Sequence, residues 1–165
     1  LGSPEAIREL VHMGPVKAQT EWMHELLVDP DITALCTVTT SEEMPVAETI
    51  ELVERVRAQL SVSLGPIFVN RVLPEPFTRA DEEVFEVLRG RGLAAATAAA
   101  GPGVPLVLEG ARLAATLRRN RTAQLAMLRD AVDLPLAYLP FLFVRSHGLR
   151  VTRMMAEALA MELGL

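Results

Sequence analysis

Apolar positions in the first half of the chain alternate between helical spacing and short continuous runs. Residues 7–27 show helical spacing that Gly14-Pro15 interrupts, which predicts a helix broken or kinked at the proline. Thr33–Thr40 and Pro66–Asn70 are short runs rich in apolar and β-branched residues, a pattern typical of buried parallel strands. Between these runs, residues 46–60 carry one apolar helical face. This order predicts a right-handed, parallel βαβ crossover.

The second half of the chain continues the alternation of helices and strands. Thr78–Arg89 predicts an acidic helix, and the Ala/Gly-rich stretch Gly90–Pro105, which has no clear period, predicts a mobile loop or a variable helix. A long helix is expected over Leu106–Val132, a strand over Leu134–Phe143, and a last helix after Gly148. The expected core stripe of the long helix consists of Leu106, Gly110, Leu113, Leu117, Leu125, Leu128 and Val132. The fold class is therefore α/β with a parallel sheet.

The predicted elements divide one domain into four parts. These are a helical segment (1–30), the βαβ unit (33–70), a second helical segment (78–132) and a last strand, loop and helix (134–163). The chain opens with Leu1 instead of a methionine, and no signal sequence is visible. We therefore expect it to be a fragment of a larger protein.

Composition narrows the class of protein. With 50% hydrophobic and 22% charged residues among 165, the chain is long and apolar enough to fold around a core. A net charge of -5 argues against a nucleic-acid partner, which requires a basic surface. The single cysteine, Cys36, is expected to be buried in a strand and fits a reducing compartment such as the cytoplasm. No apolar run approaches the roughly 20 residues of a membrane span, so no transmembrane segment is expected.

Several kinds of catalytic and metal site find no support in the sequence. No segment matches the phosphate loop G-x-x-x-x-G-K-[ST], so nothing is expected to hold a triphosphate. The histidines His12, His24 and His147 stand apart from one another, and none has a convincing second metal ligand at helical spacing. We therefore expect no metal site and no catalytic residue within this chain.

Three polar or aromatic segments follow the carboxyl ends of predicted strands, where α/β proteins bind ligands. Glu42 and Glu43 follow the first strand, but acids in a first helical turn also serve as partners of the helix dipole. Asn70 begins the loop Asn70–Pro76 after the second strand, and Pro140–Val144 follows the third. An Asn carboxamide suits the N6 and N7 positions of adenine, and a Pro/Phe/Leu segment suits the flat base. The alternative, that Asn70 only caps a turn, is equally open from the residues alone.

An ordered series of segments resembles the ArsA family of arsenite-pump and tail-anchored-protein-targeting ATPases. Thr39–Thr49 is similar to a strand-to-helix passage of that family, and Ile67–Pro74 is similar to the strand whose terminal Asn recognises adenine. Leu139–Leu142, with Val144–Leu149, resembles the second adenine-flanking loop and the final helix. Gly14–Gln19 matches the helix after the family's second switch. The resemblance covers nearly the whole chain and is weakest over residues 90–105.

The resemblance implies the carboxyl-terminal half of an ATPase with a partial P-loop NTPase-like (deviant Walker, SIMIBI-type) sheet. Asn70 would then hydrogen-bond adenine, Pro140, Phe141 and Leu142 would form the wall around it, and Arg71 would contact the purine or ribose. ATP is the implied ligand, with Mg²⁺ and hydrolysis expected only in the full-length protein, whose phosphate loop and switches would precede this chain. A homodimer or a paired ATPase subunit is the implied partner, and some family members also carry a hydrophobic client.

Two competing hypotheses remain at this point. The chain could be a non-catalytic interaction module that pairs with a complete ATPase subunit. An unrelated α/β enzyme is the other alternative, and it predicts several ionisable groups converging at the strand ends. The sequence places mainly apolar residues and one asparagine there, which favours the nucleotide-binding hypothesis.

Overall fold

The computed structural model describes residues 6, 14–75, 78–144 and 148–165, and within these ranges it is an α/β protein, as expected. The helix predicted before Gly14 lies outside the described residues. The described helices and strands are, in chain order, α2 (Pro15–Val28), β1 (Leu35–Thr40), α3 (Glu43–Gln59), β2 (Leu64–Val72), α4 (Arg79–Arg89), α5 (Leu93–Ala100), α6 (Val104–Ala131), β3 (Leu136–Pro140) and α7 (Leu149–Leu163).

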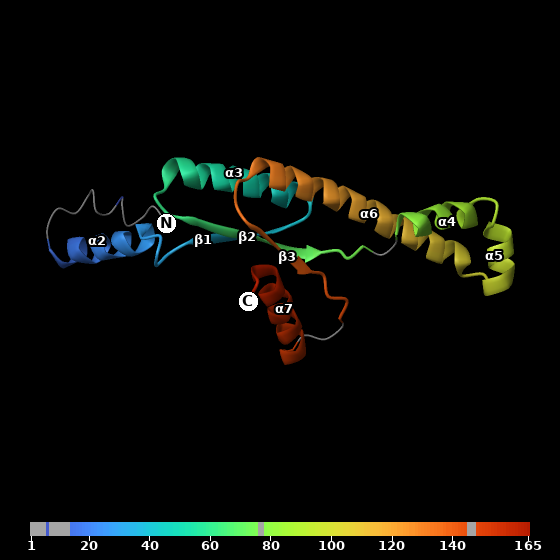
Figure 1. The fold of residues 1–165 in the computed structure, drawn as a ribbon. Helices are drawn as coiled ribbons and strands as arrows, with labels where there is room; N and C mark the ends of the chain where they lie inside the picture. The colour runs from blue at the N-terminus through green and yellow to red at the C-terminus, as the bar shows by residue number, and fades with distance from the viewer. Residues whose placement is uncertain (1–5, 7–13, 76–77, 145–147) are drawn as a thin grey trace.

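The described strands form one parallel sheet in the order β1-β2-β3 (Figure 1). Thr40 at the end of β1 is paired with Asn70 of β2, and Val69 is paired with Tyr138 of β3. The carboxyl ends of the strands therefore meet at one edge of the sheet, as the βαβ prediction required. The second strand extends two residues further at each end than predicted, and the third is shorter than its apolar run.

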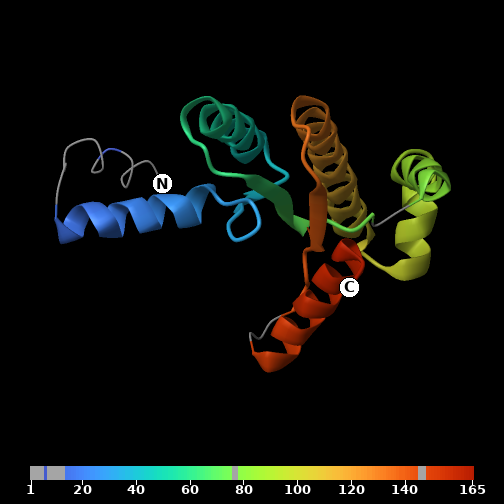
Figure 2. The same cartoon turned by 60° about the vertical axis from the view of Figure 1, so that its left-hand side comes forward.

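Helices α3 and α6 cover one face of the sheet, and α7 lies on the opposite face against β3 (Figure 2). The core forms where α3, the carboxyl-terminal part of α6 and the central strand meet. Val46 of α3, Ile67 of β2 and Leu128 of α6 have no exposed surface. Burial of such aliphatic side chains is the main stabilising contribution in a core of this size. The predicted apolar face of α3 is confirmed.

The expected core stripe of α6 is correct only for its carboxyl-terminal half. Leu125, Leu128 and Val132 are buried, but Leu106, with 80% of its surface exposed, and Leu113, with 60%, face away from the protein. The reason is that α6 outruns the sheet and packs its amino-terminal half on α4 instead (Figure 1). A different set of α6 residues, including Leu108 and Ala115, faces α4 and is buried there.

The expected burial of Cys36 is wrong, because its side chain is exposed. In β1 exposure alternates: Thr39 is buried beneath α3, whereas Cys36 and Val38 lie on the other face, where Val38 has 66% of its surface exposed. Within the described residues β1 pairs with β2 alone, so it is an edge strand covered on one face. A continuous apolar run can therefore belong to a half-covered edge strand as well as to a buried one.

Helices α4, α5 and the first half of α6 form an arm beyond the sheet (Figure 1). Thr78 caps α4 through a reciprocal capping box with Asp81, which explains why the predicted start of the acidic helix is correct. The alanine tract predicted as a mobile loop or variable helix forms α5, consistent with the high helix propensity of alanine.

Among the described residues, no single helix has both the length and the apolarity to span a bilayer. Helices α5 and α6 reach the length and apolar composition of a membrane span only when the two are taken together, and they are bent by 118° relative to each other.

Candidate functional site

The end of β2 contains a bulge at the sheet edge where the sequence predicted a ligand site. The pairing of β2 with β3 shifts register between Val69 and Val72, so one extra residue lies on the β2 side. Within this bulge Arg71 has a φ of 58°, in the left-handed region that non-glycine residues seldom occupy. Bulges of this kind redirect side chains and occur often beside binding sites.

A backbone hydrogen bond at the bulge orients the Asn70 side chain. The backbone N–H of Arg71 donates a hydrogen bond to Asn70 Oδ1 over 2.9 Å. Only the oxygen of a carboxamide can accept this bond, so the amide nitrogen, with both of its N–H donors, must point the other way. Oδ1 keeps a second lone pair. Asn70 can therefore present two donors and one acceptor to a ligand, and the N6/N7 edge of adenine needs one of each.

The loops after β2 and β3 are joined to each other. The backbone N–H of Phe141 donates to the carbonyl oxygen of Val72 over 2.8 Å. The Arg71 guanidinium carbon lies 5.2 Å from the centre of the Phe141 ring, within the range of a cation–π contact. Phe143 packs on Phe141 in an edge-to-face arrangement, with ring centres 4.7 Å apart and planes inclined by 70°. The two loops therefore lie together at the carboxyl-terminal edge of the sheet.

The five predicted site residues do not surround one closed cavity. Asn70 lines an open groove of about 370 Å³ between β1 and α3. Pro140 lines a second open groove, of about 450 Å³, between the β2 loop, α6 and α7. Arg71, Phe141 and Leu142 line neither groove. They belong to the linked loops described above, so the candidate site is a ridge flanked by open space.

Glu42, the other strand-end candidate, forms an ion pair with a residue of α6. Arg121 Nη2 lies 2.8 Å from Glu42 Oε1, and the Arg121 side chain has only 22% of its surface exposed. Thr40 donates a further hydrogen bond to Glu42. Glu42 thus ties the start of α3 to α6. The adjacent Ser41 is buried at 1% exposure, with no hydrogen-bond partner for its hydroxyl among the described residues.

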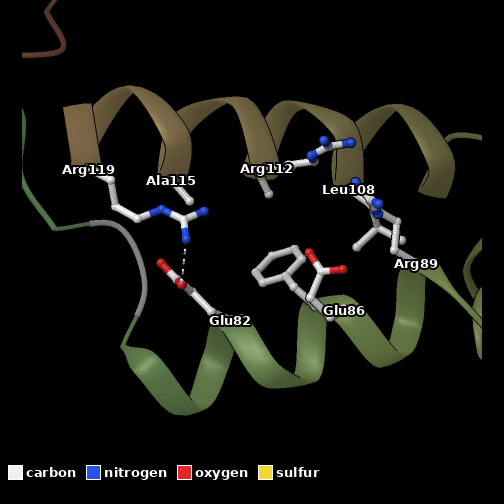
Figure 3. A pocket seen from close by; sticks show the side chains of 9 residues that line it. Glu82, Glu86, Arg89, Leu108, Arg112, Ala115 and Arg119 are labelled. Carbon is white, nitrogen blue, oxygen red and sulfur yellow. Dashed lines mark ion pairs between the residues drawn. The ribbon is translucent and has the colours of Figure 1, made fainter.

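A smaller cavity that the sequence did not indicate lies between α4 and α6. It has a volume of about 100 Å³, and Glu82, Glu86 and Arg119 point into the space between the two helices (Figure 3). Glu82 on α4 pairs with Arg119 on α6 at 3.9 Å, and the rest of the lining mixes apolar side chains with further acids and arginines. Ligand pockets usually measure at least about 300 Å³, so this space suits an interhelical seam better than a nucleotide site.

Metal ligands and perturbed ionisable groups do not concentrate at the sheet edge. Throughout the described ranges no group of three or more His, Cys, Asp or Glu residues could hold a metal ion. Hydrogen bonds from the Thr78 hydroxyl and backbone N–H hold the pKa of Asp81 below its usual value, but that carboxylate caps α4. What the edge offers is hydrogen bonding and stacking, which suit recognition of a planar base.

Comparison with known proteins agrees with this fold. The family model described as "Anion-transporting ATPase" (ArsA_ATPase) matches residues 2–90. ATPase BagA of Mycobacterium tuberculosis (strain ATCC 25618 / H37Rv) is 33% identical over 143 residues, which cover 82% of this chain and 41% of BagA. The proteins Mb3704 of Mycobacterium bovis and MT3781 of a second M. tuberculosis strain, whose names also describe them as ATPases, match to the same extent.

The parallel sheet flanked by helices is consistent with a P-loop NTPase-like fold, and the family match defines the class more closely. The chain belongs to the ArsA-type, anion-transporting ATPase family, so the resemblance seen in the sequence is confirmed. It spans 41% of the length of the curated relatives that it matches.

Proposed function

We propose that this chain supplies the base-binding part of an ATPase's nucleotide site and that ATP is the nucleotide. The observation that carries the proposal is the orientation of Asn70, whose Oδ1 accepts the Arg71 N–H over 2.9 Å, so that its amide donors point away from that N–H. Membership of an ATPase family supports a nucleotide over other planar ligands.

The residues at the edge fit an adenine base by their chemistry. Asn70 would donate from its amide to an acceptor such as N7 and accept from the N6 amino group. Phe141 offers an aromatic face, and Pro140 and Leu142 extend the apolar surface beside it. Arg71 adds a positive charge at the same place. Together these side chains would bind and orient the base.

Hydrolysis, in this proposal, belongs to a part of the protein outside this chain. The 165 residues contain no phosphate-loop motif, and phosphoryl transfer depends on groups that cradle the phosphates and Mg²⁺. We propose that those groups, and the Mg²⁺, come from the remainder of a full-length ATPase in the cytoplasm that acts as a homodimer or with a paired subunit. This chain would then select the nucleotide without cleaving it.

An Asn70→Ala substitution in the full-length protein tests the proposed base contact. Loss of the carboxamide should weaken ATP binding by about 1–3 kcal/mol, because the edge of the base is left unpaired. The ratio of the affinity for ATP to the affinity for GTP should also fall. Asn120→Ala is the matched control, since this second asparagine lies on the exposed side of α6. Equilibrium titration with labelled nucleotide measures both quantities, and unchanged affinity together with unchanged base preference contradicts the proposal.

A second candidate function is favoured by the open groove along β1. Within the described part of the chain β1 has no strand partner on its outer side, and the groove there is lined by Val38, Leu52 and other residues of β1 and α3. Edge strands of this kind readily accept a further strand. The chain could therefore be a non-catalytic module that docks on a complete ATPase subunit. The module is favoured if this chain binds a complete ATPase subunit, if Val38→Lys abolishes that binding, and if this chain binds no nucleotide.

The exposed leucines of the helical arm suit an apolar partner. Leu106 and Leu113 have 80% and 60% of their surfaces exposed, and Val107 has 68%. Exposed apolar patches frequently mark interaction sites. We propose a hydrophobic client for this face as a secondary feature of the same ATPase.

A further inference from the structure

The last turn of α7 contacts the outer edge of β3, on the side of the strand that faces away from β2. The backbone N–H of Tyr138 donates a hydrogen bond to Glu162 Oε2 over 2.9 Å. Glu162 is the penultimate residue of α7, and this end of the helix meets β3 (Figure 2). In the described part of the chain no strand pairs with the outer edge of β3. A helix side chain therefore takes the place that a further strand would occupy.

The backbone groups of β3 that face outward follow from its pairing with β2. The carbonyl oxygen of Pro135 accepts a hydrogen bond from β2, so residue 135 faces that strand. Backbone groups of successive strand residues point to opposite edges, which turns Leu136, Tyr138 and Pro140 outward. Proline has no N–H, so the outward donors of this short edge are those of Leu136 and Tyr138. Glu162 occupies the central one of the three outward positions.

The position of Glu162 is electrostatically unfavourable for the helix that carries it. Free carbonyl groups give the carboxyl-terminal end of a helix a partial negative charge, which favours basic residues and disfavours acids there. The last turn of α7 contains Glu162 and no basic residue. The hydrogen bond from the Tyr138 N–H offsets this repulsion. The carboxylate is therefore held in place by the strand and not by its own helix.

We propose that Glu162 closes the edge of β3 against strand addition, and that the strand it excludes is β3 of a second copy of this chain. A sheet edge with unpaired N–H groups readily accepts a further strand. The outward groups of β3 are complementary to themselves in an antiparallel arrangement with a two-fold axis at Tyr138. The two tyrosines would exchange N–H···O=C bonds, and Leu136 of each copy would donate to Pro140 of the other. Pro140 would only have to accept, so its missing N–H is no obstacle.

The Glu162 side chain opposes this pairing in two ways. It occupies the Tyr138 N–H, which is the central donor of the shared edge. It also carries a negative charge, and the two-fold axis would bring the carboxylates of both copies together, where they repel each other. The inference goes beyond nucleotide binding, because it concerns backbone groups at the outer edge of β3 and one carboxylate of α7.

The test is analytical ultracentrifugation of the full-length protein and its Glu162→Ala variant over a range of concentrations. Alanine is a good helix former and removes an acid from the helix end, so α7 should be retained. We expect Glu162→Ala to associate one step beyond the wild type, with a Kd on the order of 100 µM, as befits a small interface. The wild type should keep a constant mass, and so should the control Glu157→Ala, which changes an exposed acid of the same helix.

Hydrogen exchange locates the contact in the same samples. The Tyr138 amide of Glu162→Ala should exchange faster than in the wild type when dilute, and more slowly as the concentration rises. A constant mass for Glu162→Ala overturns the inference, and so does association that leaves the exchange of Tyr138 unchanged. Glu162→Gln keeps an oxygen that can accept the Tyr138 N–H, so it should associate more weakly than Glu162→Ala. Equal association of the two variants would mean that this hydrogen bond does not close the edge.

Discussion

Arg71 and Asn70 are joined by a hydrogen bond between a backbone N–H and the neighbouring side-chain oxygen, 2.9 Å long. The same residue, Arg71, adopts a φ of 58° within a bulge of β2. The hydrogen bond fixes which end of the Asn70 carboxamide faces outward, a choice that decides whether the residue offers donors or only an acceptor. The backbone N–H of one residue therefore holds the carboxamide of its neighbour in one orientation.

The left-handed conformation of Arg71 predicts different stability effects for two substitutions. Arg71→Gly should change the free energy of unfolding by less than about 1 kcal/mol, since relief of backbone strain offsets the added freedom of the unfolded chain. Arg71→Val should destabilise by about 1–3 kcal/mol, because a β-branched residue is strained at positive φ. Urea unfolding of both variants measures the difference. Equal stability of the two would mean that Arg71 is not held at positive φ.

A pair of leucine substitutions on α6 tests which part of that helix belongs to the core. Leu128→Ala should cost about 2–5 kcal/mol, because the side chain is fully buried and leaves a cavity. Leu106→Ala should change stability by less than about 0.5 kcal/mol, since 80% of that residue is exposed. Chemical denaturation again provides the measurement. A large loss of stability in Leu106→Ala would mean that another part of the protein covers the amino-terminal half of α6.

Most elements and the strand-end position of Asn70 could be predicted from the sequence, because local patterns determine them. The apolar period of α3, the Thr78 cap and the strand-end position of Asn70 all depend on neighbouring residues. The exposure of Cys36 and of Leu106 could not be predicted, because it depends on which distant element covers the face where each residue lies. The bulge at Arg71 was also unforeseen, since a non-glycine residue carries no sequence signal for positive φ.

The ion pair between Glu42 and Arg121 predicts a structural role for Glu42, which the sequence left open. Glu42→Gln should lower the free energy of unfolding by about 0.5–1 kcal/mol. This loss is at the upper end of the range for exposed ion pairs, because the Arg121 side chain is largely covered. A double-mutant cycle with Arg121→Gln should recover that coupling energy. Glu54→Gln, on an exposed part of α3, serves as the control. Zero coupling, with a loss of nucleotide affinity in Glu42→Gln, would favour a functional role instead.

The capping box of α4 predicts a pH-dependent effect of Thr78→Ala. At neutral pH the substitution should cost about 0.5–2 kcal/mol of stability through loss of the cap. The Thr78 hydrogen bonds hold the pKa of Asp81 below its value in the unfolded chain. The carboxylate therefore favours the folded state above about pH 4, and this contribution disappears as the pH falls through the lowered pKa. Thermal melts at pH 7 and pH 3 should show a smaller wild-type-to-variant difference at pH 3, and a constant difference would contradict the assignment.

Photolabelling of the full-length protein with 8-azido-ATP, followed by mapping of tryptic peptides, tests the central claim most directly. The azide is attached to the base, so the label marks the residues that surround it. We predict label in the peptides covering residues 58–79 or 130–145, which contain Asn70, Arg71 and the Pro140–Leu142 wall. Excess unlabelled ATP should compete the label away. Competable label that is absent from both regions and found only elsewhere in the protein would contradict the assignment of the base site to this sheet edge.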